Sequence, residues 1–192
     1  MSLQDTVTKQ YVSDPKVFAD AFNYLIYDGE QVIQPEQLTD LDATQFAIPY
    51  REEEEGKPEA TQKYRDVLKT LAVKTDEHCT YLVLGIENQS NVHYAMPVRN
   101  MLYDAMQYEK QVRQLAAAHR KKHDAATSDE YLSGMSREDK IAPVITLVIN
   151  FGSKRWDGPL SLHEMMNEHP PEVRAFIQDL SLIHISEPTR PI

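Results

Sequence analysis

The sequence predicts an α/β fold in which helices cover the faces of a small mixed sheet. Two nearly continuous apolar runs, at residues 79–87 and 143–151, are typical of strands that are buried on both faces. A long segment between them keeps its apolar residues at helical spacing, and a shorter amphipathic segment precedes both. This order of elements fits a chain of 192 residues that folds as one domain, or as one domain with an extension.

The first predicted helix begins at Asp14-Pro15, where Asp14 caps the N-terminus and Pro15 occupies the first helical position. One apolar face follows at helical spacing, formed by Phe18, Ala21, Phe22, Leu25 and Ile26. Asp28-Gly29 ends the helix. Residues 1–13 are polar and show no periodicity, so we expect a flexible leader there.

The next part of the chain predicts strands. Residues 44–50 predict a short strand, and residues 64–73 predict a longer one ahead of the apolar run at 79–87. Residues 52–58 contain four adjacent glutamates together with Gly and Pro. We expect a charged loop at 52–58, because neighbouring carboxylates repel one another and do not pack.

The second predicted helix is long and begins at Pro97. It ends in the basic run at residues 119–123, where the helix dipole favours cations. Residues 124–140 are polar and predict a loop before the strand at 143–151. A last helix is expected near Ser161, because Ser161 and Glu164 have the spacing of a capping box.

The C-terminal residues 180–190 resemble the translated product of a transposon-end adapter used in preparing sequencing libraries. We therefore expect a native domain at 14–179 that is truncated at its C-terminus, and a non-native tail at 180–192. Such a tail would make few contacts with the core. The alternative is an ordinary C-terminal segment.

The charge balance limits the classes of function. The chain has 30 Asp and Glu against 20 Lys and Arg, a net charge of −10. This balance argues against a broad, nonspecific nucleic-acid binder, since such proteins neutralise phosphates with Lys and Arg. It does not exclude a nuclease, because metal-binding sites are themselves acidic.

Composition also indicates the compartment. The single cysteine, Cys79, excludes an internal disulfide framework and a cysteine-based zinc site. No apolar run reaches the about 20 residues that span a bilayer, and the N-terminus lacks the features of a signal peptide. We therefore expect a cytoplasmic protein that has no membrane partner.

The candidate site lies where the apolar strand at 79–87 gives way to polar residues. Glu87 and Gln89 should point to the same face of the sheet, because side chains alternate along a strand. If the strand that contains Asp66 is a neighbour, Asp66 and Glu87 converge and could hold Mg²⁺ or Mn²⁺. Such an ion can orient a phosphodiester and lower the pKa of a water molecule. The alternative is that both acids are merely solvated at strand ends.

Three segments together resemble the PD-(D/E)XK nuclease superfamily. They are residues 65–69 (Arg-Asp-Val-Leu-Lys), residues 87–90 (Glu-Asn-Gln-Ser) and residues 96–103. The closer resemblance is to its bacterial Rpn branch, the recombination-promoting nucleases, also described as YhgA-like transposases. The likeness runs from about residue 18 to residue 164.

The resemblance implies an α-β-β-β-α-β core, a divalent-metal site and DNA as the partner. It makes Asp66, on the second core strand, and Glu87, on the third, the catalytic acids that hold the metal. Gln89 stands where the wider superfamily has lysine, so it can orient a water or a phosphate oxygen but supplies no charge. The resemblance thus implies a Mg²⁺-dependent (or Mn²⁺-dependent) DNA endonuclease of a transposon- or recombination-associated protein.

The long helix carries further candidates. Arg99, Tyr103, Gln107 and Lys110 form one stripe, in which Arg99 could bind the scissile phosphate and Tyr103 could hydrogen-bond beside it. The alternative is the amphipathic border of a helix that faces the core. The basic run at 119–123 is either a DNA-backbone contact or a solvated helix end.

Two readings of the function follow. The first is the metal-dependent endonuclease, with Asp66, Glu87 and Gln89 as its catalytic set. The second is a binding module for DNA or protein that keeps the fold without turnover; the acidic total charge favours it. Asp20 and Asn23 on the first helix could reach the metal site, although surface capping or packing is the simpler role for them. A homo-oligomer is left open.

Overall fold

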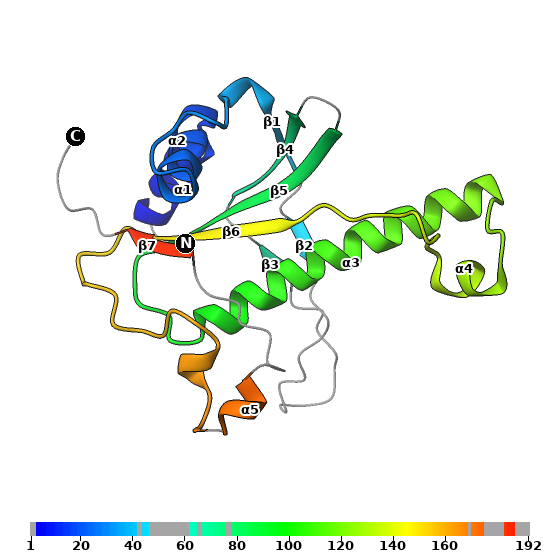
Figure 1. The fold of residues 1–192 in the computed structure, drawn as a ribbon. Coiled ribbons are helices and arrows are strands. Elements are labelled where there is room, and N and C mark those ends of the chain that lie inside the picture. The colour runs from blue at the N-terminus through cyan, green and yellow to red at the C-terminus, as the bar shows by residue number, and fades with distance from the viewer. Residues whose placement is uncertain are drawn as a thin grey trace.

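The structure is a computed structural model that describes residues 3–41, 44–46, 62–64, 67–75, 78–168, 170–174 and 183–186. The fold is α/β, as predicted, with a mixed five-stranded sheet at its centre (Figure 1). In spatial order the strands are β1 (Leu38–Asp40), β4 (Val67–Thr75), β5 (His78–Gln89), β6 (Val144–Asn150) and β7 (Ile183–Ser186). The pairs β1·β4 and β4·β5 are antiparallel, whereas β5·β6 and β6·β7 are parallel.

Helices cover both faces of this sheet. Figure 1 shows α1 (Leu3–Ser13) and α2 (Pro15–Ile26) on one side and α3 (Met96–Lys122) on the other. The short elements are η1 (Pro35–Gln37), α4 (Ser128–Ser133), η2 (His163–Met165), α5 (Pro171–Arg174), and a separate antiparallel pair, β2 (Thr44–Phe46) with β3 (Gln62–Tyr64). None of the helices in the described part of the chain combines the length and the hydrophobicity needed to cross a membrane.

The face under α1 and α2 carries the hydrophobic core. Leu84, Ile86 and Leu147 from β5 and β6 are fully buried in one cluster with Phe18 and Phe22 of α2. The two phenylalanine rings lie 5.0 Å apart, a separation typical of favourable aromatic pairs. Each such side chain contributes about 1.5–3 kcal/mol when it is removed from water. Apolar burial therefore holds α2 on this face.

Helix α2 begins where the sequence predicts. The Asp14 carboxylate accepts hydrogen bonds from the backbone N–H groups of Lys16 (2.8 Å) and Val17 (3.4 Å). These bonds satisfy two of the donors that a helix leaves unpaired at its N-terminus. The helix ends before Gly29, whose φ of +89° lies in the left-handed region that favours glycine.

Asn23 ties the chain that leaves α2 back onto the helix. Its Nδ2 donates to the Ile33 carbonyl (2.9 Å), and its Oδ1 accepts from the Ile33 N–H (2.8 Å). Both Asn23 and Ile33 are buried. The side-chain amide therefore satisfies two buried backbone groups that would otherwise lose their hydrogen bonds to water.

Asn23→Ala is expected to lower the free energy of unfolding by about 2–3 kcal/mol, because it leaves both backbone groups of Ile33 without this partner. Asn23→Asp replaces the donor with a buried carboxylate oxygen that faces the Ile33 carbonyl oxygen, so its loss should be at least as large. Urea unfolding followed by circular dichroism measures both. The control is Asn91→Ala at an exposed loop position, which should change stability by less than about 0.5 kcal/mol. Equal losses for Asn23→Ala and Asn91→Ala would contradict the role of Asn23.

One expectation about the N-terminal part of the chain is wrong. The leader expected at residues 1–13 is instead helix α1 over its described residues, because Val12 is buried in the core cluster. Tertiary packing of this kind stabilises a helix that its own sequence pattern does not predict. The short strand predicted at residues 44–50 is confirmed over residues 44–46, which form β2 in the separate pair, whereas β1 of the main sheet was not predicted. The expected loop at 52–58 lies outside the described residues.

The C-terminal tail also differs from expectation. Residues 183–186 form β7, which pairs in parallel with β6 and shifts register between Leu147 and Val148. Isoleucine favours strands, and the outer edge of β6 offers backbone groups that a further strand can pair with. Strand formation here needs only those two properties, so it does not decide whether the tail is native. Residues 180–182 and 187–192 lie outside the described residues.

The later expectations are largely confirmed. Strand β5, helix α3 and strand β6 coincide closely with the predicted elements. The predicted loop at 124–140 additionally contains α4, whose capping box joins Thr127 and Glu130. At the last predicted helix start, the Glu164 N–H donates to Ser161 Oγ (3.3 Å), but the turn continues only as the short 3₁₀ helix η2.

The face under α3 is polar, in contrast to the α2 face. The Gln111 side-chain amide forms two hydrogen bonds with the backbone of Ala142 (2.6 and 3.0 Å), and the Tyr108 hydroxyl accepts from the Val144 N–H (3.1 Å). Among the described residues, a small apolar cluster forms near the start of α3 around Met96, Val148 and Trp156. Directional hydrogen bonds therefore help to position helix α3, and polar side chains lie between it and the sheet.

Candidate functional site

Glu87 lies in this polar layer. Leu84 and Ile86 of β5 face the α2 side, so strand alternation turns Glu87 and Gln89 toward α3. Glu87 is 1% exposed and Gln89 is 9% exposed. The Gln89 Nε2 donates a hydrogen bond to Glu87 Oε1 (3.3 Å), which confirms that the two side chains share one face.

Arg99 meets the same carboxylate from α3. Its Nη2 lies 2.6 Å from Glu87 Oε1, and its Nε donates to the Tyr103 hydroxyl (3.1 Å). The Arg99 side chain is 32% exposed, so it reaches from the surface down to a buried anion. Removing the partner of a buried charge costs about 3–5 kcal/mol. The pair is therefore a strong constraint on how α3 sits over β5.

Tyr103 contacts Arg99 through both its hydroxyl and its ring. It lies four residues after Arg99, so both side chains project from the same face of α3. Tyr103 is 1% exposed, and the Arg99 guanidinium carbon lies 5.5 Å from the centre of its ring. The ring and the hydroxyl together restrict where the guanidinium can move. The predicted stripe on the helix thus brings Arg99 and Tyr103 to Glu87.

Further polar residues of α3 continue the layer, and sequence reasoning missed most of them. Asp104 Oδ1 accepts a hydrogen bond from Thr146 Oγ1 of β6 (2.7 Å). Asn100 and Gln107 are also buried, and Asn100 Oδ1 and Gln107 Nε2 have no hydrogen-bond partner among the described residues. The sequence does contain a signal for this layer. Residues 100, 104 and 107 are polar at helical spacing, and the apolar strand at 143–151 contains Thr146.

Asp66 lies outside the described residues, so its approach to Glu87 stays a prediction. Its sequence neighbour Val67 pairs with Ile86, which directly precedes Glu87. Within the described residues there is no group of three or more His, Cys, Asp or Glu that could hold a metal ion. The donor chemistry that the described site offers is a buried carboxylate beside an amide, which suits hard cations such as Mg²⁺ and Mn²⁺.

The two candidates on α2 do not join this site. Asn23 is engaged with the backbone of Ile33, and Asp20 is exposed. Both belong to the packing and the surface of α2, the simpler of the two roles considered for them.

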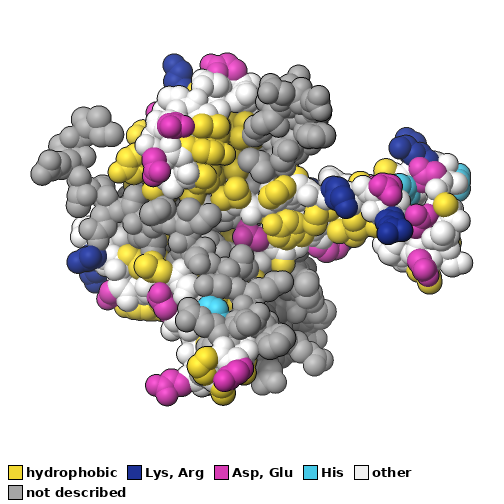
Figure 2. Space-filling view, in the orientation of Figure 1, with side chains coloured by type: hydrophobic (Ala, Val, Ile, Leu, Met, Phe, Trp, Pro, Cys, Tyr) yellow, Lys and Arg dark blue, Asp and Glu magenta, His cyan; other side chains and the backbone are white. Residues whose placement is uncertain are grey.

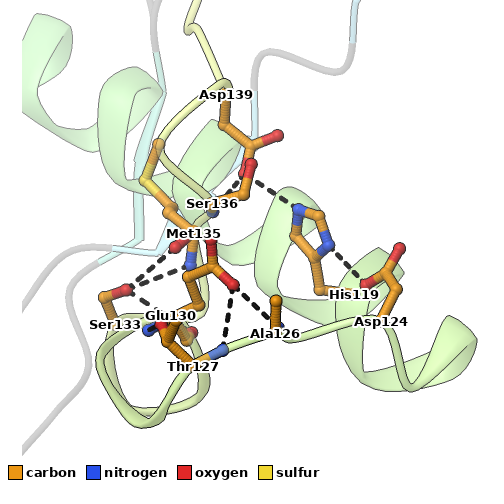
Figure 3. Close-up of polar contacts among 9 residues, drawn as sticks. All are labelled: His119, Asp124, Ala126, Thr127, Glu130, Ser133, Met135, Ser136 and Asp139. Carbon is orange, nitrogen blue, oxygen red and sulfur yellow. Dashed lines mark hydrogen bonds and ion pairs between the residues drawn. The ribbon is translucent and has the colours of Figure 1, made fainter.

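The basic run at the far end of α3 is divided between two environments. His119 turns inward, where its Nδ1 lies 2.6 Å from Asp124 Oδ1 and its Nε2 lies 2.8 Å from Asp139 Oδ2 (Figure 3). Arg120 and its two neighbouring lysines are exposed. Figure 2 shows that acidic and basic side chains both gather at this end of the molecule, so the surface is of mixed charge.

The His119–Asp139 contact connects the end of α3 with the chain that follows α4. The hydrogen bond to Asp124, followed by the one to Asp139, raises the pKa of His119 above its usual value. The backbone N–H of Ser136, together with His119, lowers the pKa of Asp139. The contact is strongest where His119 is protonated and Asp139 is ionised, since an imidazolium donates from both ring nitrogens.

Stability from His119 should therefore be complete below its unfolded pKa of about 6.5 and disappear as the pH rises through its raised folded pKa. The stability from Asp139 has the opposite pH dependence, because it is lost as the pH falls through the lowered folded pKa of Asp139. Urea unfolding of the wild type and of His119→Gln, across about pH 5 to 9, measures the first effect. The stability difference should shrink as the pH rises. A difference that is constant over this range would contradict the assignment.

Comparison with protein-family models, with curated proteins and with solved structures finds no match to this chain.

Proposed function

We propose that this chain is a Mg²⁺-dependent DNA endonuclease-like domain of the PD-(D/E)XK superfamily, from its recombination-promoting (Rpn) branch. The observation that carries the proposal is the buried Glu87 carboxylate at the polar end of β5, with Gln89 and Arg99 both bound to its Oε1. A buried carboxylate is costly unless it is paired, and it is seldom found where only packing is needed.

The topology supports the same proposal. The order α2, β1, β4, β5, α3, β6 is the α-β-β-β-α-β order that the family implies, with the small β2·β3 pair inserted between β1 and β4. The pairing of Val67 with Ile86 is also the register that would bring the two sequence neighbours, Asp66 and Glu87, opposite each other.

In the proposed reaction, Asp66 and Glu87 would hold the divalent ion through carboxylate oxygens. A divalent ion held there would supply a water of lowered pKa and charge neutralisation at the phosphodiester. Gln89 orients the water or a phosphate oxygen through its amide. Arg99 binds the phosphate with its planar guanidinium, and the Tyr103 hydroxyl holds the Nε of that arginine in place.

Glu87→Gln is expected to lower Mg²⁺-dependent plasmid cleavage by at least about 100-fold, because the amide has nearly the same shape but cannot neutralise the ion. The matched control is Glu109→Gln, which removes the same charge from the exposed Glu109–Arg113 pair on α3 and should leave the rate unchanged. Cleavage of supercoiled plasmid, with and without Mg²⁺, measures both variants. If Glu87→Gln cleaves as fast as the wild type, the proposed site is wrong.

Gln89 is expected to contribute less than Glu87, since an amide orients a ligand without neutralising charge. Gln89→Ala should therefore lower the cleavage rate by less than Glu87→Gln does in the same assay. Gln89→Lys restores the residue of the wider superfamily and should retain or raise activity. A loss in Gln89→Lys as large as in Glu87→Gln would exclude the proposed role of this position.

One observation favours the second reading, a binding module without turnover. The Glu87 oxygen already carries a close ion pair with Arg99 and a hydrogen bond from Gln89, as in a site that serves structure. If the wild type binds duplex DNA but cleaves no substrate at any concentration of Mg²⁺ or Mn²⁺, this reading is the better account.

A further inference from the structure

The far end of α3 and the α4 segment form an exposed tip, which we define as residues 116–140. Figure 1 shows that this tip projects away from the sheet. Tyr131 is 73% exposed and Leu132 is 82% exposed, the two highest values among the large hydrophobic side chains of the described residues. Two such side chains next to each other on a projecting element are typical of an interaction surface, in which tyrosine is enriched.

A hollow of about 310 Å³ lies between α3 and α4 at this tip. Ala116, Ala125 and Tyr131 give its lining apolar surface, and Arg120 and Glu130 are among its charged residues. An apolar cavity of about 150 Å³ already holds a molecule the size of benzene. The hollow can therefore hold a leucine side chain of another molecule.

The contacts within the tip make it a preformed surface. A Cβ atom at Gly134 would lie 2.5 Å from the Cβ atom of Ala116, so the end of α4 lies directly against α3. The two ring nitrogens of His119 contact Asp124 (2.6 Å) and Asp139 (2.8 Å) on either side of α4. A surface that is already ordered loses little conformational entropy when a partner binds to it.

The charges of the tip differ from those of the rest of the chain. The tip contains five Lys and Arg and five Asp and Glu, whereas the whole chain has a net charge of −10. Two copies of the chain therefore repel each other through the rest of their surfaces, but not through their tips.

The two signs of charge lie on different parts of the tip. Lys121 and Lys122 are exposed at the end of α3, and Asp129 and Glu138 are exposed on α4 and after it. Within the described residues, none of these four side chains takes part in an ion pair. All four charges are therefore available to a partner that carries the opposite signs at matching positions.

We propose that the tip binds the tip of a second copy of this chain and forms a two-fold symmetric dimer. In such a dimer the same surface is used by both copies, so the basic end of α3 in each copy faces the acidic α4 segment of the other. Leu132 of each copy occupies the hollow of the other copy. This association is independent of the proposed function, since it uses none of the residues between α3 and the sheet.

The charge balance favours a second copy over a nucleic acid at this surface. Nucleic-acid binding depends on an excess of Lys and Arg that neutralises phosphates, and the tip has no such excess. A surface with equal numbers of both signs is complementary to itself. The small area of one tip indicates a weak and reversible dimer.

Sedimentation velocity of the full chain over a range of concentrations tests the dimer. The wild type is expected to show a reversible monomer–dimer equilibrium. Leu132→Ser and Tyr131→Ser should each raise its dissociation constant by at least about tenfold, because each removes a central apolar contact. The matched control is Tyr24→Ser on α2, which removes an equally exposed tyrosine (71%) and should leave the equilibrium unchanged.

A charge exchange tests which surfaces meet. Lys121→Glu with Lys122→Glu makes the tip acidic, and Asp129→Lys with Glu138→Lys makes it basic, so each double variant alone should be monomeric. An equimolar mixture of the two should form a heterodimer, since opposite charges then face each other. The control for total charge is Lys16→Glu with Lys154→Glu, at two exposed positions outside the tip, which should dimerise as the wild type does.

Three outcomes would overturn the proposal. The first is a wild type that remains monomeric at every concentration up to about 1 mM. The second is a dimer that Leu132→Ser, Tyr131→Ser and the charge variants leave unchanged, which would place the interface elsewhere. The third is a monomer that binds single-stranded DNA and loses this binding in Lys121→Glu with Lys122→Glu, which would assign the tip to nucleic acid. The wild-type measurement needs no variant, so it decides even if a substituted tip fails to fold.

Discussion

The structure depends on one buried charge. Glu87 is 1% exposed in the layer between β5 and α3, and an isolated carboxylate in such a place would be strongly unfavourable. Arg99 stabilises it from the first turns of α3, and Gln89 does so from two residues along the strand. The requirement to pair this carboxylate sets the position of the start of α3. It also explains why Arg99 is part of the site rather than an ordinary surface arginine.

The two faces of the sheet are packed differently, one through apolar side chains and the other through hydrogen bonds. Leucine and isoleucine side chains meet the phenylalanines of α2 on one face, where burial is nondirectional and tolerant of small shifts. On the other face, contacts such as Asp104–Thr146 and Gln111–Ala142 fix α3 by hydrogen-bond geometry. Directional contacts hold a side chain more narrowly in place, which is what a site built across a helix and a strand requires. The apolar face contributes most to stability, and the polar face determines where α3 lies on the sheet.

Sequence reasoning recovered the elements whose patterns are local. The cap at Asp14, the strand predicted at residues 79–87 and the long helix predicted from Pro97 all follow from neighbouring residues, and so does the shared face of Glu87 and Gln89. It missed α1, β1 and β7, because each is stabilised by contacts with distant parts of the chain rather than by its own periodicity. The pairing of Arg99 with Glu87 was also missed, since it depends on how α3 crosses the sheet. The prediction had assigned Arg99 to a phosphate alone.

The most direct test of the central claim is to locate the cation. Bound Mn²⁺ broadens the NMR signals of nearby backbone amides, so its position can be mapped along the chain. The account predicts that sub-stoichiometric Mn²⁺ broadens Glu87, Gln89 and Arg99 first, and that Glu87→Gln abolishes this effect. Broadening that is centred instead on Asp124 and Asp139, at the far end of α3, would show that the buried carboxylate is not the metal site.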